Sequence, residues 1–278
     1  MSSAPPQVSA TPVLSAPLPL WKRPAFVAGS VAFVLFMVIL TRLGRRRLSF
    51  GTDVRADPDL AFDFAFAWSL VPDMLNALTV TAMATIYGFL IALVLGLFLA
   101  LGRRSDHRLI SWPVAAFIEF VRSTPLLVQL FFLFFALPSW GITLSPLQTL
   151  MIGLGVHYAT YCSEAYRAGI NSVPKGQWEA TTALNLDTPT TWLRVVLPQA
   201  IPNVLPALGN FLVAGFKDAP LGSAVQVTGV LFFAQTISSR YFRPVEAFLL
   251  IGVGFLIVSI PAAWGVRRLE KRIGYERT

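Results

Sequence analysis

The chain has 278 residues, of which 55% are apolar and 13% are charged. This composition is typical of a membrane protein and excludes a disordered chain or an ordinary soluble enzyme. The formal net charge of +8 could suggest nucleic-acid binding. In so apolar a chain, the accumulation of Lys and Arg on the cytoplasmic side of a membrane explains it better. We therefore predict a membrane protein that contacts lipid and binds no nucleic acid.

The first quarter of the chain predicts a tail, one span and a linker. Residues 1–23 are rich in Pro, Ser and Ala, which is typical of a disordered tail. Residues 24–41 are uncharged and start too late for a signal peptide, so they predict an extra transmembrane helix that is retained. Residues 42–75 predict an external linker. Its stretch DPDLAFDFAFAWSLVPDML alternates acids with aromatics, which favours an amphipathic segment at the membrane surface.

The rest of the chain predicts further membrane spans. Uncharged runs occur at 74–102, 123–163 and 247–266, and the second is long enough for two spans. We place spans within or close to these runs, at 76–101, 124–137, 146–166 and 245–267. DHRLISWPVAAFIEFVRSTP predicts an interfacial helix before the span 124–137, and LPSWGITLSP predicts the hairpin after that span. Residues 201–238 are too long and too broken for one plain helix, because they contain Pro202, Pro206 and GFKDAPLG. We predict an all-α polytopic membrane protein with about six transmembrane helices and a C-terminal tail at 273–278.

Lys and Arg counts predict the orientation. With the N-terminus inside and six spans, more of these residues fall on the cytoplasmic side than outside, although the cluster Arg42–Arg47 opposes this arrangement. The orientation places the polar stretch 172–200 in the cytoplasm.

Within that stretch, KGQWEATTALNL predicts a short helix. Ala180, Ala183 and Leu184 would share an arc of about 100°, and two of them are alanines, so another surface could approach closely. Glu179 falls in the first turns, where the helix dipole favours an acid, and Asn185 suits a left-handed closing position.

A second helix is predicted directly afterwards. Thr188 can cap it, Pro189 suits its first position, and Pro198 would interrupt it before the membrane. The two helices predict a helix–turn–helix that protrudes from the membrane, and a simple interfacial loop remains the alternative.

Two acid–base pairs near helix ends are interpreted first as structural ion pairs. Glu119 and Arg122 are three residues apart and predict an ion pair, as do Glu164 and Arg167. Glu164 remains a candidate for contacting an amino-acid ammonium group.

Lys217 and Asp218 interrupt an apolar stretch, which is costly inside a membrane. Adjacent helical positions point about 100° apart, so the two would pair poorly unless the helix breaks. Pro220 would break it. Lys217–Pro220 therefore predicts a gate beside the path, with a buried ion pair or an external loop as the alternatives.

Enzymatic chemistry is not supported by the sequence. Its two histidines, His107 and His157, form no metal-ligand motif, and no phosphate-binding G-x-x-x-x-G-K-[ST] loop occurs. Broken helices with intramembrane charges would also suit a secondary transporter driven by an ion gradient. Against that class stand the lack of internal repeats and the polar stretch 172–200.

The stretch EATTALNLDTPTTWLRVVLP resembles the EAA loop of binding-protein-dependent ABC-transporter permeases. Glu179, Ala180, Leu197 and Pro198 match that pattern, whereas Asn185 stands where Gly is usual. Thr181 stands where Ala is usual and would add a methyl and a hydroxyl group to the docking surface. FIEFVRSTPLLVQLFFLFFALP, SEAYRAGINSVPKGQWEA, GFKDAPLGSAV and RYFRPVEAFLL are similar to the polar amino-acid (histidine and glutamine) branch. The resemblance covers about residues 60–272.

This resemblance implies an importer permease core of five helices at 76–272, preceded by the extra helix. The loop 172–200 would be a coupling helix seated in a groove of a separate ATPase. Its implied contact residues are Gly176, Trp178, Glu179, Ala180, Thr181, Ala183, Leu184, Asn185, Leu197 and Pro198. Glu164, Lys217, Asp218 and Pro220 would line the path or gate.

The resemblance also implies the assembly. The chain would hold no catalytic residue, metal or cofactor, since ATP and Mg would bind two partner ATPase subunits. A second permease subunit, identical or different, and a periplasmic or lipid-anchored solute-binding protein would complete an importer in the bacterial inner membrane. The cargo would be a polar amino acid or a related zwitterion such as an opine or an ectoine.

Overall fold

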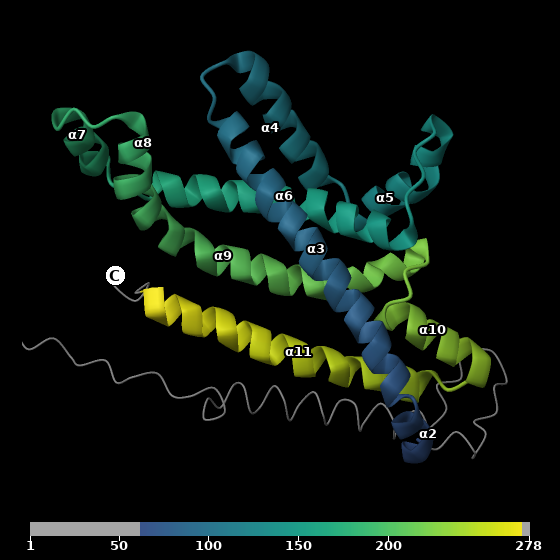
Figure 1. Cartoon of the computed structure of the whole chain (residues 1–278). Helices are drawn as coiled ribbons and strands as arrows, with labels where there is room; N and C mark the ends of the chain where they lie inside the picture. Colours follow the sequence, from purple (N-terminus) through teal and green to yellow (C-terminus); the bar gives the residue numbers. More distant parts are fainter. Residues whose placement is uncertain (1–61, 274–278) are drawn as a thin grey trace, which may run out of the picture. The chain divides into compact units, whose positions relative to one another are not determined.

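A computed structural model of the chain describes residues 62–273, and within this part every element is helical (Figure 1). The predicted tail 1–23, the predicted span 24–41 and most of the linker 42–75 lie outside the described residues. The α-helices are α2 (Phe64–Ser69), α3 (Val71–Arg103), α4 (Arg108–Ser123), α5 (Leu126–Phe131), α6 (Pro146–Asn171), α7 (Lys175–Ala183), α8 (Thr188–Thr190), α9 (Leu197–Asp218), α10 (Val230–Tyr241) and α11 (Pro244–Ile273). Shorter π and 3-10 segments are η3 (Phe132–Ala136), η4 (Leu137–Trp140), η5 (Thr191–Val196) and η6 (Ala219–Val225).

The centre of the structure is the contact between α3 and α6. Small residues recur at every fourth position of α3 and are buried: Ala84, Gly88, Ala92, Gly96 and Ala100. A Cβ added to Gly96 would lie 2.7 Å from the Cβ of Cys162, so the two helix backbones are almost in contact. Small residues let membrane helices pack this closely, which strengthens their dispersion contacts.

Length and composition identify three helical segments that could cross a membrane: Val71–Arg103, Thr188–Val225 and Pro244–Lys271. α4 and the segment Leu126–Trp140 would make a fourth together, bent by 106° at the break between them. The predicted span 124–137 is therefore not a straight helix of its own. The chain bends at Thr124–Pro125, where the predicted span begins, because proline disfavours helical geometry in the residue before it.

α6 matches the predicted span 146–166 in position but is more polar than the other long helices. It starts with a capping box, in which the Ser145 hydroxyl accepts from the Gln148 amide and the Gln148 side chain accepts from the Ser145 amide. His157, Tyr161 and Glu164 all lie on it. These polar groups are tolerable at membrane depth because α6 packs against α3 and α9.

The predicted interruption within 201–238 is confirmed, but not at its first two prolines. α9 continues through Pro202 and Pro206. The α-helix ends at Asp218 and tightens into η6, after which Gln226 has a left-handed backbone with φ of 65°. α10 then begins at Val230.

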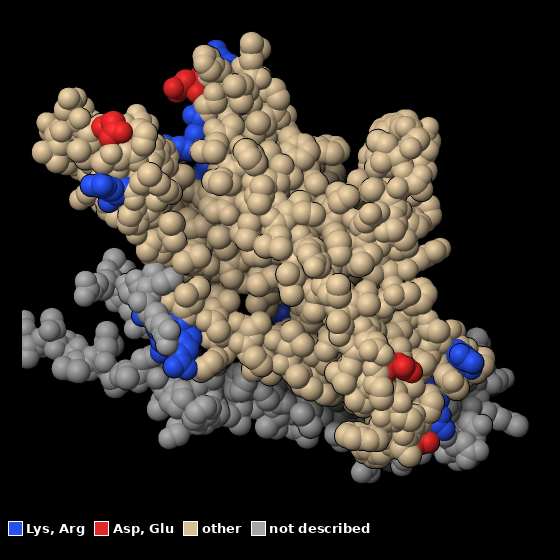
Figure 2. All heavy atoms as spheres, in the orientation of Figure 1, with Lys and Arg blue, Asp and Glu red and all other residues tan. Residues whose placement is uncertain are grey.

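Charged side chains mark the two ends of the helices. On the face drawn in Figure 2, most Lys, Arg, Asp and Glu atoms gather at opposite ends, and the broad surface between them shows only a small patch of Lys or Arg atoms in a hollow. α7, α8 and the connection between α3 and α4 share one end (Figure 1), where the Arg104 guanidinium donates to the Asn171 side chain at 2.7 Å. A wide apolar belt between charged ends is the pattern of a multi-pass membrane protein.

Candidate functional site

α7 has two faces in different surroundings. Thr181 is 5% exposed and Trp178 is half-buried, so this face packs on the rest of the chain. The opposite face covers an arc of about 140°. Its exposed residues are Gly176, Glu179, Ala180, Ala183 and Leu184. Leu184 is 71% exposed, so an apolar side chain flanked by small residues projects into solvent.

Two expectations for α7 are wrong in detail. Thr181 does not lie on the exposed face, since its hydroxyl donates to the carbonyl oxygen of Trp178 at 2.7 Å inside the packed face. Glu179 lies in the second turn, because α7 starts at Lys175. Its carboxylate is therefore beyond the strongest part of the helix dipole.

The end of α7 is confirmed as predicted. Asn185 has a left-handed backbone with φ of 51°. The Leu186 amide donates to the Thr181 carbonyl, and the Asn185 amide to the Thr182 carbonyl, both at 3.0 Å. These two bonds form a Schellman motif, in which Asn replaces the usual Gly. The motif turns the chain sharply and leaves Leu184 at the tip.

Side-chain contacts brace the loop against the long helices. The Trp178 and Trp192 rings meet edge to face, with centroids 5.7 Å apart. The Asn203 amide on α9 donates to the Ser172 hydroxyl at 2.7 Å, and the Gln199 amide donates to the Gln177 side chain at 3.3 Å. Beneath them lies an apolar cluster of Ile170, Val173, Val196 and Ala200. A force on α7 would therefore reach α6 and α9 without first deforming the loop.

The second helix of the loop differs from its prediction. Asp187 is the N-cap of α8, one residue before Thr188, and no side-chain bond closes the cap. Pro198 does not interrupt the helix. It follows the π-helical segment η5, and the run continues directly into α9. Widening the turn to i→i+5 bonds accommodates a residue that has no amide hydrogen. Leu197 is half-buried and Pro198 is exposed.

The predicted gate residues lie where α9 changes into η6. Asp218 is half-buried and accepts a hydrogen bond from the Tyr158 hydroxyl at 2.6 Å. Lys217 is exposed, and Pro220 is half-buried in the first turn of η6. The helix tightens here but does not unwind. Asp218 is thus tied to α6 and not to its neighbour Lys217.

The other two acid–base pairs behave differently from each other. Glu164 and Arg167 form the predicted ion pair, at 2.9 Å. Glu119 and Arg122 do not. Arg122 lies instead over the Tyr161 ring, with its guanidinium carbon 5.3 Å from the ring centroid. The Glu164 carboxylate is thus already paired with a cation, whereas the Asp218 carboxylate is bonded to a neutral hydroxyl.

Sequence reasoning missed the aromatic residues that connect these charges. The rings of His157, Tyr158 and Tyr161 lie within 6 Å of one another on α6, and Phe211 of α9 contacts Tyr161. The available signal was their spacing, since positions 157, 158 and 161 share one side of a helix. Among residues 62–273, no group of His, Cys, Asp or Glu could hold a metal ion.

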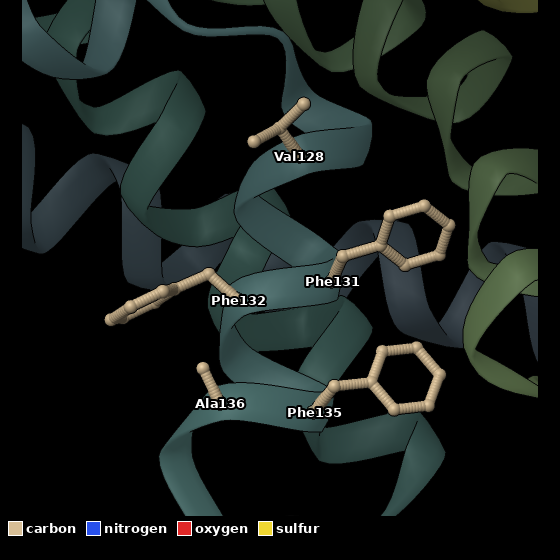
Figure 3. A pocket seen from close by; sticks show the side chains of 5 residues that line it. All are labelled: Val128, Phe131, Phe132, Phe135 and Ala136. Carbon is tan, nitrogen blue, oxygen red and sulfur yellow. The ribbon is translucent and has the colours of Figure 1, made fainter.

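An open apolar groove lies apart from these charges on α5 and η3. It is lined by Val128, Phe131, Phe132, Phe135 and Ala136. Phe131 and Phe135 point to one side of the segment and Phe132 to the other (Figure 3). The lining side chains offer no hydrogen-bonding group, so the groove is unsuited to a zwitterion.

Comparison with known proteins identifies the family. Residues 92–275 match the family described as binding-protein-dependent transport system inner membrane component. A probable amino-acid ABC transporter permease protein of Sinorhizobium fredii is 42% identical over 75% of this chain and 90% of its own length. An L-cystine transport system permease protein of Bacillus subtilis is 36% identical over 66% of this chain and 80% of its own length.

A solved structure agrees with these relatives. The crystal structure of an amino acid ABC transporter with histidines is similar at a TM-score of 0.72 and 29% identity, covering 76% of this chain and 99% of that chain. Since the family match extends over well more than half of the sequence, this chain belongs to the binding-protein-dependent transport system inner membrane components.

Proposed function

We propose that the chain carries a polar amino acid, or a related small zwitterion, through the bacterial inner membrane as the permease subunit of an ATP-driven importer. Relatives named as amino-acid and L-cystine permeases support this cargo class. The partners are two ATPase subunits that bind ATP and Mg, a second permease subunit and an external solute-binding protein. The chain itself contributes no catalytic group.

The exposed face of α7 is the observation that carries the proposal. It presents Leu184 and the alanines 180 and 183 to solvent at one end of the helices. Such a face suits insertion of a short helix into a groove of a partner. Because Trp178 packs on Trp192 and the loop is bonded to α9, closure of the ATPases would be transmitted through the loop to α9.

The cargo would pass near the junction of α9 and η6. Asp218 is a carboxylate held in place by Tyr158 within an apolar stretch, which suits contact with an ammonium group. Lys217 and Pro220 would flank it as parts of the gate.

A double variant tests the coupling role. Glu179→Lys with Ala183→Trp reverses one charge and fills the exposed face of α7 without touching its packed side. We expect the variant to insert normally but to lose copurification of the ATPase and to show background uptake. Uptake is measured in proteoliposomes loaded with ATP, in the presence of an ionophore that collapses ion gradients.

A matched control introduces the same two residues, Lys and Trp, on the other loop at this end. Asp106→Lys with His107→Trp alters two exposed residues between α3 and α4, and it should retain uptake and ATPase binding. Normal uptake by the α7 variant would refute the coupling role. Uptake that needs no ATP and stops with the ionophore would favour a gradient-driven transporter instead.

A further inference from the structure

Arg122 is a cation that lies against the middle of α6 and has no charged partner in the described part of the chain. It lies over Tyr161, which is 15 residues after the start of α6 at Pro146 and 10 before its end at Asn171. These separations correspond to about 22 Å and 15 Å along the helix, so Tyr161 is far from both ends. The two ion pairs found within residues 62–273 are Glu164–Arg167 and Arg243–Glu246. Neither includes Arg122.

The chain builds a specific corner to hold this arginine. Arg122 occupies the last turn of α4, just before the 106° bend into α5. The Gln129 amide donates to the Val121 carbonyl at 2.8 Å and to the Thr124 hydroxyl at 2.9 Å, which binds the two sides of the bend together. A corner fixed in this way directs the guanidinium onto α6, even though the side chain stays exposed.

The surroundings of Arg122 lead to a carboxylate on another helix. Its platform Tyr161 has its ring centroid 5.9 Å from that of Tyr158, whose hydroxyl donates to Asp218. An accessible cation and a carboxylate are therefore connected through the contact between two tyrosine rings. An exposed guanidinium is costly in the hydrocarbon region of a membrane. This cost is avoided where the side chain faces a water-filled path.

We propose that Arg122 binds the carboxylate of the transported amino acid. The inference rests on the proposed function and adds a requirement to it: the substrate must carry a free carboxylate. The planar guanidinium can bind a carboxylate through two parallel N–H···O bonds while its face remains on Tyr161. Asp218, which is connected to Arg122 through the two tyrosines, remains the candidate for the substrate's ammonium group.

Equilibrium binding tests this assignment. The purified permease–ATPase complex in nanodiscs, without binding protein, is dialysed against radiolabelled L-amino acids that include glutamine and cystine. The amino acid that binds most tightly is then displaced by its unlabelled form or by its carboxamide, which lacks the negative charge. Wild-type complex should prefer the acid over the carboxamide by about 10- to 100-fold, as expected for a charge-assisted bond.

Two variants and a matched control define the outcome. Arg122→Gln should weaken binding of the acid by about 10- to 100-fold and bind acid and carboxamide almost equally. Arg122→Lys should keep part of the preference, because it retains the charge but not the fork. Arg240→Gln removes a comparable arginine, 5.6 Å from the Tyr241 ring centroid, and should behave as wild type.

Two other outcomes would contradict the role of Arg122, and a separate measurement decides whether the importer function stands. A wild-type preference for the acid in Arg122→Gln would overturn the role of Arg122 and leave the importer function standing. A wild-type complex that binds no amino acid would also overturn it. In that case, uptake of amino acids by the same complex with its binding protein decides separately whether the proposed function stands.

Discussion

Replacing Gly96 with alanine tests the close contact between α3 and α6. The added Cβ would lie 2.7 Å from the Cβ of Cys162 and 2.8 Å from the carbonyl oxygen of Ala159. Neither atom is the end of a flexible side chain, so the helices must separate by about 0.7 Å to restore a 3.4 Å contact. Overpacking of this kind destabilises proteins by about 1–3 kcal/mol.

Alanine also stabilises a helix relative to glycine, by about 1 kcal/mol. Gly252→Ala on α11 isolates that gain, because a Cβ at position 252 would have no neighbour within 4 Å. The propensity terms cancel between the two variants. Gly96→Ala should therefore have a free energy of unfolding about 1–3 kcal/mol below that of Gly252→Ala.

The measurement is reversible unfolding of the purified chain in mixed micelles by a denaturing detergent, followed by tryptophan fluorescence. Equal free energies of unfolding for the two alanine variants would show that the helices yield without loss of packing. The role assigned to the small residues of α3 would then be wrong.

Three further predictions concern the loop, the gate and the topology. Asn185→Val should lower the free energy of unfolding of the assembled complex by about 1–2 kcal/mol, because a β-branched residue is strained at positive φ, whereas Asn185→Gly should leave it nearly unchanged. Equal free energies of unfolding for the two variants would contradict the left-handed turn. Lys217→Met should reduce amino-acid uptake in proteoliposomes without affecting insertion or ATPase binding, and a wild-type rate would place the gate elsewhere. A reporter fused after Thr278 should report the cytoplasm and one inserted near Ser139 the outside; a cytoplasmic signal at Ser139 would reverse the orientation.

The loop shows what a sequence can and cannot predict. Asn185 was predicted because its backbone conformation depends on local chemistry, and a short polar side chain tolerates positive φ. The burial of Thr181 was not predicted, because α7 carries small residues on both faces. Which face packs inward is decided by Trp192 and Val196, whose positions depend on the rest of the fold.

The bend between α4 and α5 was missed for a different reason. Averaged hydropathy does not record a change of direction, so an apolar run with a corner looks the same as a straight span. Pro125 was the residue that indicated a possible bend. Nothing in the sequence indicated that the Gln129 side chain would bond across the corner. The predicted pairing of Glu119 with Arg122 failed with it, since the corner aims Arg122 at α6.

The small residues of α3 could have been read directly. Their spacing of four puts Ala84, Gly88 and Ala92 on one stripe, and such a stripe in an apolar helix predicts a packed face. The sequence does not identify α6 as the packing partner, because the spacing of residues in one helix does not indicate which helix packs against it.

The helical run Thr188–Val225 has a mechanical consequence. It is 38 residues long without a non-helical break, and about 45 Å separates Thr188 from Asp218 along its axis. A tilt of about 5° pivoting at the loop would displace the far end by about 4 Å. That displacement exceeds the 2.6 Å between Tyr158 and Asp218, so a small angular motion at one end is enough to break or remake this hydrogen bond at the other.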